Sequence, residues 1–166
     1  SQPDAILFRA QAYTKLGARP LAIQDYTSAI SLIAEPRPEV FIARAQLQME
    51  AKQFEAAIVG LDEGMAKLGG LVTLQTMAIE IEVERKQWDA ALTRLDAITA
   101  QMPRKEQWLV QRAEILLQAG RNTEAQQTLG SVQELIAALP DHLHKAPVIA
   151  ELSAKTKELL ARAQKH

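Results

Sequence analysis

The side chains best suited to chemistry stand close together near the C-terminus. Asp141, His142 and His144 lie within four consecutive positions, and carboxylate and imidazole groups both bind zinc or nickel. A structural zinc site generally needs four protein ligands, and the neighbouring sequence offers no clear fourth. We therefore expect a solvated turn here and no metal site, with a metal-binding or hydrolytic protein as the remote alternative.

The sequence contains few other residues or motifs that are typical of catalysis. The chain has no cysteine, three histidines, and neither a phosphate-binding glycine loop nor a dinucleotide-binding motif. Glu80 and Glu84 lie one helical turn apart, which superficially suits acid–base chemistry, but nothing in the sequence marks a pocket around them. We expect that the protein is not an enzyme and that it uses no cofactor.

Arginines recur along the chain at a near-constant interval. Arg9 and Arg44 are 35 positions apart, and Arg112 follows after 68, which is twice 34. Such a column could bind a carboxylate or a phosphate. Because Ala78 interrupts it, packing of the arginine stems between repeats is the interpretation we favour.

Length and composition narrow the class of protein. With 166 residues, 48% of them hydrophobic, and a net charge of -1, the chain is sized for one ordinary domain and is a poor candidate for nucleic-acid binding. No apolar run approaches the roughly 20 residues of a membrane helix, so we expect no membrane insertion. The lack of cysteine and of an initiator Met favours an exported or periplasmic mature chain, with a cytoplasmic location as the alternative.

The positions of these residues follow from an internal repeat. Residues 52–58 match residues 86–92 at a shift of 34, and the same shift carries Ala57 to Ala91 and Ala125. A shift of 35 leads back from Ala57 to Ala22. We expect a single domain, 1–166, with repeats at 4–37, 38–71, 72–105 and 106–139 and a capping segment at 140–166.

Each repeat is predicted to contain two helices. Val40, Leu47 and Ala51 recur at helical spacing, and a second apolar stripe runs from Phe54 to Met65. A short polar turn separates the two stripes, and prolines or glycines end the first three repeats. No strand pattern competes, so the chain is predicted to be all-α.

These repeats resemble the tetratricopeptide repeat (TPR). The resemblance rests on a small residue midway along the first helix, namely Ala10, Ala45 and Ala113, and is best in the phrase from Arg9 to Tyr13 followed by residues 21–30. It implies a right-handed α-solenoid of helix-turn-helix repeats. Paired alanines let two helices approach closely, so Ala10 should face the second helix of its own repeat.

The C-terminal segment is predicted to cap the solenoid. One helical stripe consists of Ile149, Leu152, Leu159 and Ala163. Thr156 interrupts this stripe, and Glu151 and Lys155 form a predicted ion pair on the opposite, charged face. Such a helix would cover the apolar end of the last repeat. A partner-binding helix is the alternative.

The resemblance also implies a binding surface, because the first helices of such repeats line the concave side. The predicted partner-binding groove consists of Leu7, Gln11, Thr14, Lys15, Ile42, Gln46, Met49, Glu50, Thr76, Glu80, Val83, Glu84, Val110, Glu114, Leu117 and Gln118. Within each repeat these positions share one helical face. The set contains six apolar residues, and four carboxylates against one lysine.

This groove predicts a non-enzymatic adaptor that binds a protein or peptide, with a basic or amphipathic segment favoured by charge. The lysine and asparagine clamp with which some family members hold an acidic chaperone tail is absent here. Two alternatives stay open. The apolar groove residues could contact neighbouring helices or the chain's own tail, or the repeats could be a structural module for self-association into a homo-oligomer.

Overall fold

The structure is a computed structural model that describes residues 2–164. Over these residues it contains α-helices and no strands, which confirms the predicted all-α class. The helices are α1 (Gln2–Lys15), α2 (Arg19–Leu32), α3 (Pro38–Glu50), α4 (Phe54–Leu68), α5 (Val72–Glu84), α6 (Trp88–Gln101), α7 (Glu106–Gln118), α8 (Asn122–Ala137), α9 (Asp141–His144) and α10 (Pro147–Ala163). Its contacts divide the chain into two compact units, Ser1–Ile81 and Glu82–His166, with the boundary inside α5. No helix within the described residues is long and apolar enough to cross a membrane.

The same backbone turn ends the first helix of each repeat. Gly17, Lys52, Lys86 and Gly120 occupy one repeat position, and all have a positive φ, between 58° and 74°. The following amide then bonds back five residues, as from Ala18 N–H to the Tyr13 carbonyl at 2.9 Å. This bond satisfies a carbonyl at the end of the helix. Glycine adopts this left-handed conformation freely, whereas the two lysines do so against a steric cost.

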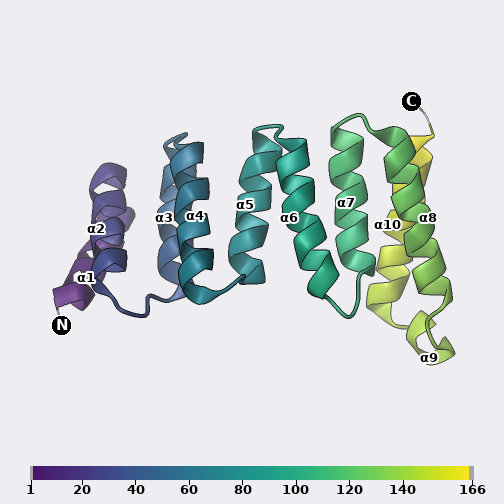
Figure 1. Cartoon of the computed structure of the whole chain (residues 1–166), viewed down its shortest axis with the longest axis horizontal. Helices are drawn as coiled ribbons and strands as arrows, with labels where there is room; N and C mark the ends of the chain where they lie inside the picture. The colour runs from purple at the N-terminus through teal and green to yellow at the C-terminus, as the bar shows by residue number, and fades with distance from the viewer. Residues whose placement is uncertain (1, 165–166) are drawn as a thin grey trace. The chain divides into compact units, whose positions relative to one another are not determined.

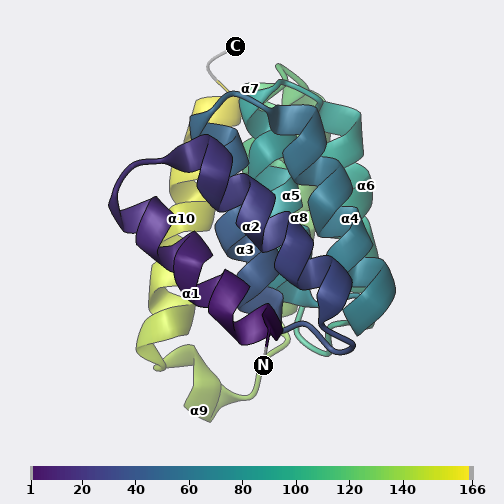
Figure 2. The same ribbon diagram turned by 90° about the vertical axis from the view of Figure 1, so that its left-hand side faces the viewer.

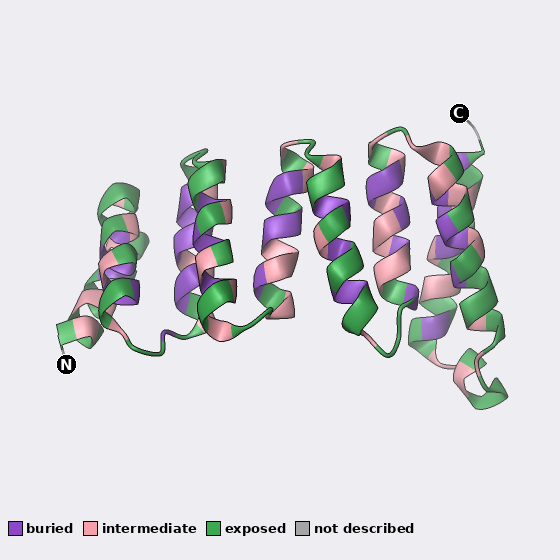
Figure 3. Ribbon diagram, viewed as in Figure 1, coloured by how far each residue is buried: buried purple, intermediate pink, exposed green. Residues whose placement is uncertain are grey.

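The first unit is built on close helix pairs. Ala10 and Ala22 have no exposed surface, and Ala45 and Ala57 are equally buried between α3 and α4. Figure 2 shows α1 and α2 in front, joined by their short turn, and Figure 3 marks the buried residues along each helix. The small side chains predicted between paired helices therefore lie where the two helices of a pair meet.

In the second unit, α10 packs on both α7 and α8. It runs in the same direction as α7 and opposite to α8, as the first helix of a further repeat would (Figure 1). Gln126 of α8 also donates a hydrogen bond to the Ala163 carbonyl at 2.8 Å. These contacts hold α10 against the last helix pair.

The buried stripe of α10 differs from the prediction at two positions. Ile149, Leu159 and Ala163 are buried, but Thr156 is buried with them and Leu152 is only half-buried. The Thr156 hydroxyl donates to the Leu152 carbonyl at 2.7 Å. Because this bond stays within the helix, the hydroxyl can be buried without losing its partner.

Candidate functional site

The arginine column is used inside the protein. In the first unit, Arg9 donates two hydrogen bonds to the Asp25 carboxylate, at 2.7 and 2.9 Å. Arg44 donates to Glu63 at 3.0 Å and to the Gly60 carbonyl at 3.2 Å. Each guanidinium thus joins the two helices of its own repeat. The hydrogen bond from Arg9 also lowers the pKa of Asp25.

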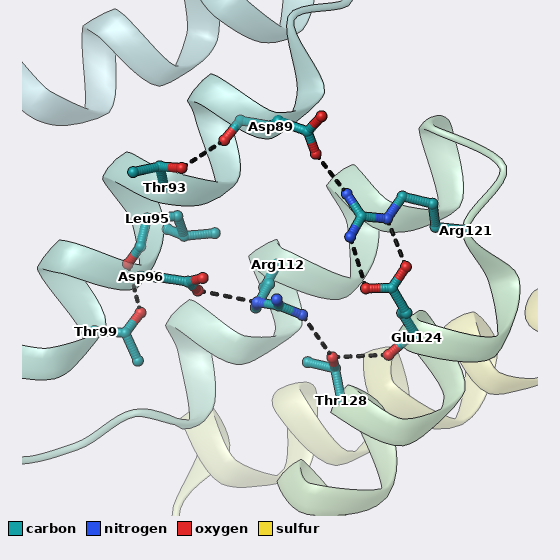
Figure 4. Close-up of polar contacts among 9 residues, drawn as sticks. All are labelled: Asp89, Thr93, Leu95, Asp96, Thr99, Arg112, Arg121, Glu124 and Thr128. Atoms are coloured by element: carbon teal, nitrogen blue, oxygen red, sulfur yellow. Dashed lines mark hydrogen bonds and ion pairs between the residues drawn. The ribbon is translucent and has the colours of Figure 1, made fainter.

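The arginine of the last repeat takes part in a wider network, drawn in Figure 4. Arg112 donates to Asp96 of α6 at 2.9 Å and to the Thr128 hydroxyl of α8 at 3.1 Å. Arg121, in the turn before α8, pairs with Asp89 at 2.8 Å and with Glu124 at 2.6 Å. The guanidinium groups bind internal acceptors, so these arginines join helices through polar contacts that the stem-packing interpretation did not include.

The third repeat carries its arginine on the other helix. Where the first helix has Ala78, the second has Arg94, at the repeat position of Asp25. Arg94 donates to the buried carboxylate of Glu82 at 2.7 Å. This exchange was not predicted, although the break at Ala78 and a new arginine 16 positions later are visible in the sequence.

The side chains considered as metal ligands in the remote alternative do not form a cluster. No group of three His, Cys, Asp or Glu side chains that could hold a metal occurs among residues 2–164. Asp141, His142 and His144 are exposed, and the His144 ring contacts the Leu139 carbonyl at 2.8 Å through Nε2. The other candidate pair, Glu80 and Glu84, is exposed as well.

In the first unit, the apolar and the polar members of the predicted groove differ in how far they are exposed. The apolar members Leu7, Ile42 and Met49 are half-buried and pack against the hydrophobic core. Among the polar members, Thr76 is half-buried, and those with exposed side chains are Gln11, Thr14, Lys15, Gln46, Glu50 and Glu80. Of these, Glu50 pairs with Arg19 of α2 at 2.6 Å. The apolar members therefore offer only part of their surface to a partner.

In the second unit, the groove residues on α5 and α7 are less accessible. Val110 is only 5% exposed, so it belongs to the core. Val83, Glu114 and Leu117 are half-buried, and the exposed members are Glu84 and Gln118. Part of the α7 face is covered because α10 packs on it.

A cleft of about 720 Å³ lies between α7 and α10 in this unit. Its apolar lining comes from Trp108 and Val110 on α7 and from Val148, Ile149 and Leu152 on α10. Trp108 is half-buried, and Val148 is 62% exposed. Two of the predicted groove residues, Val110 and Glu114, line this cleft. The packing of α10 on α7 agrees, for this repeat, with the alternative in which groove residues contact the chain's own tail.

Charged groups surround the apolar lining of this α7–α10 cleft. Lys155 of α10 pairs with Glu114 of α7 at 2.9 Å, and this bond raises the pKa of Lys155. Arg104 pairs with Glu106 at 3.2 Å. The predicted Glu151–Lys155 pair is wrong, because Lys155 turns to α7 instead. Glu151 has no ion pair with any residue between 2 and 164 and is exposed at the edge of the cleft.

Comparisons with known proteins connect this arrangement to solved structures. No protein-family model and no curated protein sequence matches the chain. A MamA RS-1 double mutant is similar in structure, with a TM-score of 0.63 and 15% identity over 99% of this chain and 97% of that one. A tetratricopeptide repeat protein from Parabacteroides merdae has a TM-score of 0.54 and 20% identity over 96% of this chain and 70% of its own. YrrB, described as a TPR protein with an unusual peptide-binding site, has a TM-score of 0.56 and 17% identity over 96% and 84% of the two chains.

Proposed function

Because the chain has the helical-repeat fold of the tetratricopeptide-repeat proteins, we propose that it is a non-enzymatic module that binds other proteins. Its partner binds along the first helices of the repeats. The observation that carries this proposal is that the first helices of the first unit combine exposed polar side chains with half-buried apolar ones. The α7–α10 cleft likewise combines an apolar lining with carboxylates. The peptide-binding site named for YrrB adds a precedent within the fold.

The partner segment is basic or amphipathic. Apolar side chains supply affinity, since removing apolar surface from water stabilises a complex by about 25 cal/mol per Å². The exposed carboxylates on the same helices attract positive charge and disfavour acidic competitors. Exposed ion pairs contribute only about 0–1 kcal/mol each, so charge acts mainly on selectivity.

The addition of positive charge to the first helices tests this proposal. Gln46 of α3 and Glu80 of α5 are both exposed, and neither makes an ion pair with a described residue. The double variant Gln46→Lys with Glu80→Lys should reduce the amount of partner protein that the immobilised chain retains. Glu114 is unsuitable for this test because its loss would also release Lys155.

The matched control places the same changes on a second helix. Gln127→Lys with Glu134→Lys alters two exposed positions of α8 and should leave partner retention unchanged. Both double variants should keep the helical circular dichroism of the parent. Equal retention by the two double variants would remove the first helices from the binding surface.

Self-association is the second candidate, and one observation favours it. In the first helix pair, Phe8 is 72% exposed and Leu16 is 78% exposed, so large apolar groups meet solvent. A second copy could cover them. Light scattering over a hundredfold range of protein concentration tests for self-association. A molecular mass that stays monomeric over this range would exclude it.

A further inference from the structure

We propose that the α7–α10 cleft binds a short segment of a partner protein in which an arginine or lysine stands between apolar side chains. This inference rests on the proposed protein-binding function and names the ligand chemistry of one place on that surface. It concerns only the second unit, where α7 and α10 pack on each other.

The size of the cleft selects a short segment. Its volume of about 720 Å³ lies within the roughly 300–1,000 Å³ of ligand-binding pockets. Such a volume accommodates a few side chains and is too small for a long helix. Val148 and Trp108 expose apolar surface to this space, so apolar side chains on the ligand would displace water from both.

The charges of the cleft select a cation. Three carboxylates, on Glu106, Glu114 and Glu151, face two cationic side chains, on Arg104 and Lys155. Because Arg104 pairs with Glu106 and Lys155 pairs with Glu114, the charge of Glu151 is left without an ion-pair partner among residues 2–164. A ligand guanidinium or ammonium group compensates that charge, and the face of an indole ring attracts the same group.

The cleft is already formed before a ligand arrives. Both of its walls are held by buried side chains, on α7 by Val110 and on α10 by Ile149 and Leu159. The ion pair between Lys155 and Glu114 joins the walls directly. A preformed site avoids the free-energy cost of ordering helices on binding, which favours measurable affinity for a short ligand.

Tryptophan fluorescence tests the proposal on the full chain. The sequence has two tryptophans, so a Trp88→Phe background leaves Trp108, in the wall of the cleft, as the only one. Phenylalanine is suitable there because Phe54 stands at the equivalent position of the preceding repeat. The probes are three pools of nine-residue peptides with a central arginine, glutamine or glutamate flanked by leucine, isoleucine and phenylalanine.

The arginine pool should change the emission of Trp108 in a saturable way. At low ionic strength it should bind up to about fivefold more tightly than the glutamine pool, which corresponds to one exposed ion pair. The glutamate pool should bind more weakly than both. An arginine pool that leaves the emission unchanged, or that binds no better than the glutamate pool, would overturn the proposal.

Variants at the edge of the cleft assign the effect to named residues. Glu151→Gln should abolish the preference for arginine over glutamine, and Val148→Ser should weaken the binding of all three pools. The control Glu134→Gln makes the same charge change on an exposed position of α8 and should change nothing. A preference that survives Glu151→Gln would contradict the assignment.

This result is separable from the test of the proposed function. If the pools do not bind but the chain retains a partner that the Gln46→Lys, Glu80→Lys variant loses, the cleft assignment fails and the broader function stands. If neither experiment shows binding, both fail.

Discussion

Replacing Gly64 with alanine should destabilise the protein, although alanine is the better helix former. Gly64 lies inside α4 and is buried. A Cβ atom added there would lie 2.9 Å from Cγ of Phe41 and 3.1 Å from Cδ1 of Leu74. Both neighbours are fully buried, so the ring cannot move aside without disturbing the core.

Two effects of opposite sign determine the size of the change. Alanine is more favourable than glycine by about 1 kcal/mol inside a helix. Overpacking of a filled core costs about 1–3 kcal/mol. The free energy of unfolding should therefore fall by about 0–2 kcal/mol in Gly64→Ala.

Gly130 provides the matched control. It lies inside α8, and a Cβ atom added there would have no atom within 4 Å outside its local helix. Gly130→Ala should therefore raise the free energy of unfolding by about 0.5–1 kcal/mol. The two variants make the same chemical change, so the difference between them reports the packing of Gly64 against Phe41.

Urea denaturation followed by circular dichroism measures both variants. We expect the midpoint to move down or stay level for Gly64→Ala and to move up for Gly130→Ala. If Gly64→Ala were as stabilising as Gly130→Ala, the close approach of α4 to Phe41 would be refuted.

Three further predictions concern single contacts. Lys86→Gly should stabilise the protein by up to about 1 kcal/mol in a thermal melt, because the φ of 58° at Lys86 strains any side chain with a Cβ atom; a lower midpoint would contradict that turn. Arg94→Met should lower the free energy of unfolding by about 2–4 kcal/mol, because it removes the ion-pair partner of the buried Glu82 carboxylate. The double variant with Glu82→Leu should recover most of this loss. No recovery in urea denaturation would count against the pair. Because Arg9 lowers the pKa of Asp25, the stability from this carboxylate is present above its unfolded pKa of about 3.9 and is lost as pH falls through its folded pKa. Asp25→Asn should then lose less stability than the parent between pH 5 and pH 2, and identical slopes would contradict the assigned cause.

The helix pairs could be predicted because their cause recurs in the sequence. Alanine stands wherever two helices approach most closely, as at Ala45 and Ala57, and the 34-residue spacing repeats that signal. The sequence shows that Gly64 stands at the repeat position of Ala29 and Ile98, so the change in side-chain size at this position was visible. Its reason was not visible, since it requires knowing that Phe41 fills the space above Gly64.

The predicted polar contacts were less accurate because their partners are distant in sequence. Spacing along one helix favoured Glu151 as the partner of Lys155, yet the packing of α10 on α7 brings Glu114 within 2.9 Å. The same packing creates a cleft that no repeat pattern contains. Val110 shows a different limit of the prediction. The family resemblance placed this residue in a binding groove, but it is buried in the core.

The most direct measurement is an amide chemical-shift map of the full chain, recorded while the arginine-centred peptide pool is added. The account predicts saturable shifts centred on Trp108 of α7 and on Val148 and Glu151 of α10, with little change along the outer face of α8. Shifts centred on α8, or no saturable shifts at all, would contradict it.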